Sequence, residues 1–76
     1  MNDTIVGFGR TIRKLRNEAG ISQERFAAMC DLHRTYISDV ELGKRNVSLE
    51  NIQKMADALN TKISDVFLEV EKVESV

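Results

Sequence analysis

Proline is absent from this 76-residue chain, and cysteine and histidine occur once each. Without proline or low-complexity stretches, every candidate break between elements is a short turn. The single cysteine, Cys30, cannot form an internal disulfide and fits a reducing cytoplasm. No apolar run approaches the ~20 residues that a membrane span requires, and the N-terminal segment lacks the basic and apolar regions of a secretory signal. We therefore expect a soluble, cytoplasmic protein without a membrane partner.

Features that would support an enzyme or a metal site are equally scarce. Cys30 and His33 have a spacing found in metal sites, but one thiol and one imidazole fill only half of a tetrahedral site. The only histidine has no serine or carboxylate partner that the sequence identifies, and no glycine-rich phosphate loop is present. We expect no catalysis, no metal and no other cofactor.

Length and composition indicate a single small domain over residues 1–76, because the chain is 42% hydrophobic and 30% charged. A domain this small buries only ~60% of its unfolded surface, so pairing would stabilise it. The net charge is −1, but residues 1–46 hold eight Lys/Arg against six Asp/Glu, whereas residues 47–76 hold three against six. Binding depends on the local patch rather than on the total charge. The counts are compatible with a nucleic-acid partner and equally with a random surface distribution.

Apolar periodicity and capping residues predict an all-α fold, a compact five-helix bundle. The expected helices span residues 6–19, 22–30, 33–42, 48–59 and a short segment from 64, with fraying after about residue 70. Gly20 and Gly43 end two helices because glycine adopts positive φ cheaply, and Ser22, Ser48 and Ser64 cap three helix starts. The positions expected in the core include Phe8, Ile12, Leu15, Ala19, Leu32, Ile37, Val40, Leu49, Ile52, Met55, Ala56 and Leu59.

Two of these helices, from Ser22 to Leu42, are separated by a tight turn at Asp31 and Leu32, and the second carries side chains that bind bases and phosphates. This arrangement is typical of a helix-turn-helix DNA-binding unit. Over about residues 8–68 the chain resembles the phage-repressor/Cro-like helix-turn-helix family, which implies a lambda repressor-like fold. Segments 32–41 and 45–49 resemble most closely the controller proteins of bacterial restriction–modification systems. The residues that carry the family resemblance are Ser22, Gln23, Glu24, Ala27, Leu32, Ile37, Ser38, Glu41 and Gly43.

The third helix of this fold lies in the major groove, so its start and its exposed face are the candidates for base contacts. Arg34 can bond guanine O6 and N7, and Thr35 can contact a base edge or a thymine methyl. The alternative for Arg34 is a solvated surface arginine, and the alternative for Thr35 is a residue at the helix start that bonds only backbone or phosphate. Asp39 can accept from cytosine N4, although orienting Arg34 or rejecting wrong sequences is the favoured role.

Contacts with the DNA backbone are expected on both sides of that helix. The resemblance implies a phosphate contact at Gln23, with plain helix capping as the alternative. Tyr36 offers a hydroxyl for phosphate or a ring for the edge of the core. The remaining candidates for backbone contacts are His33, Ser38, Lys44, Arg45 and Asn46. The alternative for His33 is a helix cap, and the alternative for residues 44–46 is a generic polar loop.

The resemblance also implies a structural ion pair between Arg16 on the first helix and Glu41 at the end of the third. Independently, the apolar residues near the C-terminal end exceed what one small core needs. We therefore expect a homodimer that forms through helices four and five. The residues assigned to this interface are Ile63, Val66, Phe67, Leu68 and Val70.

Together these features predict a sequence-specific transcriptional regulator that binds double-stranded DNA. The resemblance implies a restriction–modification controller that binds pseudo-palindromic operators, activating at one site and repressing at another. An activating role makes RNA polymerase a further partner to consider. The alternatives are an antitoxin-type repressor of a toxin–antitoxin operon and a helical protein-interaction module.

Overall fold

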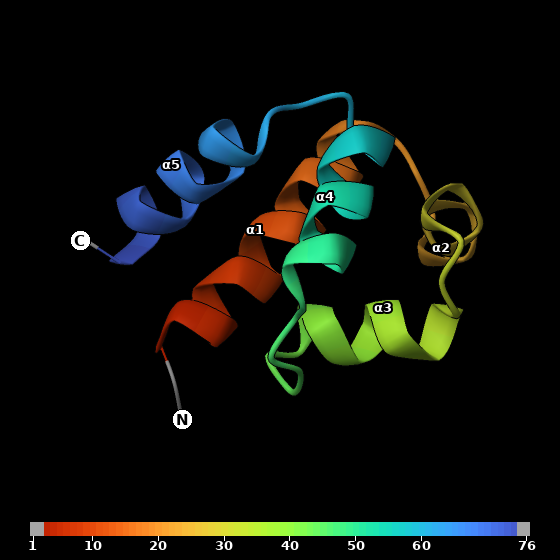
Figure 1. Cartoon of the computed structure of the whole chain (residues 1–76), viewed down its shortest axis with the longest axis horizontal. Helices are drawn as coiled ribbons and strands as arrows, with labels where there is room; N and C mark the ends of the chain where they lie inside the picture. The colour runs from red at the N-terminus through yellow and green to blue at the C-terminus, as the bar shows by residue number, and fades with distance from the viewer. Residues whose placement is uncertain (1–2, 75–76) are drawn as a thin grey trace.

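The computed structural model describes residues 3–74, with the side chains of residues 3–72. All regular structure in this part of the chain is helical, as the sequence predicts. In Figure 1, α1 crosses the molecule diagonally with α5 beside it, and α3 and α2 form the opposite edge. The helices are α1 (Asp3–Glu18), α2 (Gln23–Cys30), α3 (Arg34–Glu41), α4 (Leu49–Ala58) and α5 (Ile63–Glu74).

Helix boundaries follow local chemistry at most positions. Ser22 Oγ accepts the backbone N–H of Arg25, and Ser48 Oγ accepts that of Asn51, each at 3.1 Å. At the C-terminal ends of α1 to α4, a residue with positive φ lets the following N–H bond back to a carbonyl five positions earlier, which closes the last turn. These positive-φ residues are Gly20 (71°), Asp31 (59°), Gly43 (75°) and Asn60 (55°).

One expectation about helix ends is wrong. Ser64 does not cap the last helix, because the Lys62 carbonyl already accepts the N–H groups of Asp65 and Val66 and α5 begins at Ile63. That helix is twelve residues long and continues to Glu74. The expected fraying after about residue 70 stays a prediction, and residues 75–76 lie outside the described residues. His33 occupies the N-cap position of α3, as expected, but its side chain makes no capping hydrogen bond, since an imidazole lacks the short side-chain oxygen of a good cap.

The core forms where the helices cross. Ile12, Phe26, Ile37 and Met55 have no exposed surface and come from four different helices. Gly9 allows α1 and α3 to approach closely, because a Cβ at this position would overlap the Val40 carbonyl oxygen. The core thereby fixes the position of α3 against α1, and with it the direction in which the exposed face of α3 points.

The last helix completes this core. The Phe67 ring on α5 stacks on Phe8 of α1 with 5.7 Å between ring centroids, and Val66 and Val70 are each only 1% exposed. The expectation that the C-terminal apolar residues are surplus to one core is therefore wrong for these two valines. They are needed to cover α1 within a single chain.

Two expected core residues lie at the surface instead. Leu49 is 80% exposed, and Ala19 is also exposed. Leu49 is the first residue of α4, before the chain reaches the neighbouring helices, and Ala19 follows the last residue of α1, after the chain has left them.

None of the helices in the described part of the chain combines the length and the hydropathy of a membrane span.

Candidate nucleic-acid interface

The exposed face of α3 carries the side chains that the sequence predicts for base contacts. Ile37 and Val40 anchor the helix with 0% and 1% exposure. On the outside, Arg34 and Thr35 are exposed, and Asp39 is half-buried one turn further along the helix. His33 and Ser38 lie along the same helix, exposed and half-buried respectively. The structure thus presents a rigid helix with its polar face uncovered.

A buried ion pair locks the C-terminal end of α3 to α1. Arg16 Nε and Nη2 donate to the two carboxylate oxygens of Glu41 at 2.7 and 3.0 Å, and Nη1 donates to the Ile21 carbonyl at 2.8 Å. The two charged side chains are only 10% and 3% exposed. Hydrogen bonding to Glu41 raises the pKa of Arg16 although burial opposes the charged form. The bidentate geometry restrains rotation of α3 against α1.

The amide of Gln23 connects this ion pair to the reading face. Its Nε2 donates to Glu41 Oε1 at 3.1 Å, and its Oε1 accepts from Arg34 Nη1 at 3.4 Å. A chain of hydrogen bonds therefore runs from the buried pair to the exposed arginine. In this structure one N–H of the Gln23 amide donates to Glu41 and the amide oxygen accepts from Arg34. A phosphate contact of Gln23 itself stays a prediction.

Asp39 pairs with Arg45, whereas the sequence favours a role in orienting Arg34 or in rejecting wrong sequences. Arg45 Nε lies 3.6 Å from Asp39 Oδ2. The turn at Gly43 brings the following connection back along α3, and the Lys44 N–H bonds to the Asp39 carbonyl at 2.9 Å. That reversal of the chain brings the Arg45 side chain within reach of the Asp39 carboxylate. Lys44, Arg45 and Asn46 are all exposed on this connection.

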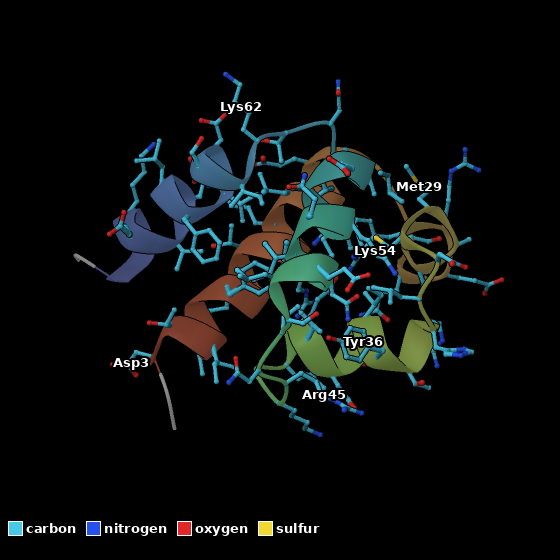
Figure 2. The ribbon with its side chains drawn as sticks, viewed as in Figure 1. Asp3, Met29, Tyr36, Arg45, Lys54 and Lys62 are labelled. Atoms are coloured by element: carbon cyan, nitrogen blue, oxygen red, sulfur yellow. The ribbon has the colours of Figure 1, made fainter. Side chains whose placement is uncertain are left out.

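The only tyrosine of the chain lies at the junction of α3 and α4. The Arg45 guanidinium is 5.4 Å from the centre of the Tyr36 ring, and Figure 2 shows both residues at the lower edge of the molecule. Asn51 Nδ2, from the first turn of α4, donates to Tyr36 Oη at 3.2 Å. Sequence reasoning missed Asn51, and its only local signal was its position after the Ser48 cap.

Cys30 and His33, the two residues whose spacing is found in metal sites, differ in exposure. Cys30 is buried, and burial raises the pKa of its thiol to about 11, so it is protonated at neutral pH. His33 is exposed. The described residues contain no group of three or more His, Cys, Asp or Glu side chains that could hold a metal ion.

Known proteins with similar sequences and folds are regulatory. A helix-turn-helix family model matches residues 12–66. The control protein C.MunI of a Mycoplasma species is 49% identical over 73 residues, which are 95% of this chain and 99% of that protein. The control protein C.BamHI of Bacillus amyloliquefaciens is 52% identical over 60 residues, covering 78% of this chain and 74% of that one.

A solved structure has the same fold. The crystal structure of the restriction-modification controller protein C.AhdI from Aeromonas hydrophila matches with a TM-score of 0.81 and 46% identity. The match covers 83% of this chain and 96% of that one. These relatives are regulatory helix-turn-helix proteins rather than enzymes.

Proposed function

This chain belongs to the helix-turn-helix family of DNA-binding transcription regulators, and from that membership we propose that it controls restriction–modification genes by binding a pseudo-palindromic operator as a homodimer. The regulatory role is supported by the similarity to the control proteins C.MunI and C.BamHI and to the restriction-modification controller protein C.AhdI. The observation that carries the DNA-reading role is the uncovered polar face of α3, with Arg34 and Thr35 exposed at its start. Arg34 and Thr35 read bases in this proposal, and the polar residues around them bind phosphates.

The dimensions of the protein support a two-fold arrangement. Half-sites on one face of DNA are about 34 Å apart, whereas one protomer measures 32 Å along its longest axis and presents one reading helix. Two copies related by a two-fold axis would present two copies of α3 to successive major grooves. A pseudo-palindromic operator is the sequence counterpart of that symmetry.

Selection of bound sequences from random duplex DNA tests the proposed function. We expect enrichment of one pseudo-palindromic sequence, bound with a steep dependence on salt because phosphate contacts release counterions. A protein-interaction module would show no enrichment and a shallow salt dependence, and that result would overturn the proposal. A toxin that copurifies with the protein would favour an antitoxin role instead.

The dimer surface can be tested at Leu68, which is 55% exposed on α5, whereas Ile63 and Phe67 are half-buried. We expect Leu68→Glu to weaken dimerisation at least about tenfold, because a charge would enter the apolar centre of the interface. Sedimentation across a concentration series measures this. Met29→Glu, at a 47% exposed position on α2, is the matched control and should leave the dimer intact.

A point substitution is preferable to deleting the C-terminal helix. Deletion would remove Val66 and Val70 from the core, so it would unfold the protomer whether or not α5 forms the interface. An unchanged dimer in the Leu68→Glu variant would contradict the assignment of α5.

The Asp39–Arg45 pair gives a second prediction. Asp39→Asn should raise affinity for all duplexes by up to about fivefold, the effect of a surface ion pair, because Arg45 becomes free for phosphate. Binding titrations against the selected operator and against mixed-sequence duplex measure this. If Asp39 instead accepts from cytosine N4, the same variant weakens only the operator and relaxes preference at one base pair.

A further inference from the structure

A shallow hollow separates the exposed start of α3 from the first turn of α4. Its lining residues are Leu32, His33, Thr35, Tyr36, Arg45 and Asn51. Tyr36 joins two of the others: Asn51 donates to its hydroxyl, and the Arg45 guanidinium lies over its ring. The hollow adjoins the face on which Arg34 and Thr35 are exposed. A DNA strand bound to that face would pass close to it.

The direction of the Asn51–Tyr36 hydrogen bond decides what the tyrosine can offer. An amide NH₂ group has donors only, so Tyr36 Oη is the acceptor in the 3.2 Å contact. A phenol has one proton, and that proton is then free for another partner. Asn51 is itself held by the helix start, because its backbone N–H bonds to Ser48 Oγ at 3.1 Å.

Arg45 adds a positive charge to this neutral donor. Its side chain is 54% exposed and lies over the Tyr36 ring, 5.4 Å from the centroid, with Nε 3.6 Å from Asp39 Oδ2. A surface ion pair of this kind is weak, so the guanidinium can still bind a second anion. A hydroxyl donor and a guanidinium at the rim of an open hollow suit an anionic group with several acceptor oxygens. In duplex DNA that group is the phosphodiester.

We propose that Asn51 is a positioning residue for DNA-backbone binding: by donating to Tyr36 Oη it aims the tyrosine hydroxyl proton at a phosphodiester in the hollow beside Arg45. This inference rests on the proposed DNA-binding function. It assigns α4 a part in the interface, since Asn51 acts through Tyr36 across the junction of α3 and α4. A negatively charged oxygen accepts the hydroxyl better than a neutral one, so the alignment matters most in the bound state.

A double-mutant cycle on the full chain tests this mechanism. The probe is a duplex carrying the sequence selected from random DNA. Tyr36→Phe and Asn51→Ala should each weaken binding about tenfold, but Asn51→Ala should add nothing in the Tyr36→Phe background. Gln53→Ala is the matched control, because Gln53 lies on the same helix with its amide bonded to Asp57; we expect unchanged binding.

Asn51→Asp reverses the hydrogen bond and sharpens the test. A carboxylate only accepts, so it would capture the hydroxyl proton that the phosphate needs. Asn51→Asp should therefore bind more weakly than Asn51→Ala, and Tyr36→Phe should narrow that difference. If the difference in affinity between Asn51→Asp and Asn51→Ala is the same with Tyr36 and with Phe at position 36, the inference is overturned. The negative charge of the new carboxylate would then explain the difference without the tyrosine hydroxyl.

Tyrosine NMR provides a readout that does not depend on DNA. Tyr36 is the only tyrosine, so [¹³Cζ]tyrosine labelling gives one signal, which should shift between the free wild-type protein and free Asn51→Ala. An unshifted signal, or equal losses of affinity from Asn51→Ala in both backgrounds, overturns the inference while DNA binding stands. Failure of the wild-type protein to bind any duplex overturns the proposed function, and this inference with it.

Discussion

Glu41→Ala should lower the free energy of unfolding by about 3–5 kcal/mol, because it strands a buried charge. The Arg16 guanidinium would keep its bond to the Ile21 carbonyl but lose both carboxylate oxygens. Its side chain is only 10% exposed, so water cannot easily replace them. For a chain of this length the loss is a large part of the total stability. Urea denaturation followed by circular dichroism measures the change.

Two variants separate a stranded charge from a general loss of packing. Glu69→Gln removes the surface ion pairs that Glu69 forms with Lys14 and Lys72, and it should cost far less than Glu41→Ala. Arg16→Met combined with Glu41→Leu should recover most of the lost stability, since an apolar pair leaves no charge without a partner. If Glu41→Ala costs no more than Glu69→Gln, the pair is not a structural lock.

The local chemistry of single residues predicted much of this fold. Ser22 and Ser48 cap their helices, and Gly20 and Gly43 take the positive φ that glycine adopts without strain. These outcomes depend on residues within one turn of each other. The helix-turn-helix arrangement was indicated by the pattern of two short helices around a tight turn and by the family resemblance.

Features that depend on crossing helices were not predictable in the same way. Leu49 fits the apolar repeat of its helix, yet no neighbour reaches the first residue of α4. Val66 and Val70 look surplus by count, but α1 needs both to cover it. The bond between Tyr36 and Asn51 joins side chains fifteen residues apart. Its existence depends on where α3 and α4 meet, which periodicity does not specify.

The sequence predicted which residues are candidates for base contacts, but it did not predict the hydrogen bonds that hold those residues in place. The sequence and the resemblance locate Arg34 at the start of a reading helix. The structure adds the amide of Gln23, which joins Arg34 to Glu41. An arginine restrained in this way loses less conformational freedom on binding than a free surface arginine would.

Arg34→Ala should weaken operator binding by about 1–3 kcal/mol per half-site, or about 2–6 kcal/mol for a dimer that uses both half-sites. The side chain is exposed at the first position of α3, where its guanidinium can form two parallel bonds with guanine. Its removal should also flatten preference at one base pair, which we expect to contain the guanine that Arg34 contacts. Folding should be unaffected, because Arg34 is exposed and its hydrogen bond to Gln23 is long, at 3.4 Å.

The measurement is a binding titration against operators varied at every position, repeated at several salt concentrations. Arg45→Ala is the informative control. If Arg45 binds phosphate, its loss weakens every sequence alike and lowers the salt slope by about 1, whereas Arg34→Ala changes the ranking of sequences. An Arg34→Ala protein with unchanged preference at every position would show that another residue is the principal reader, and Thr35 would then be the next to replace.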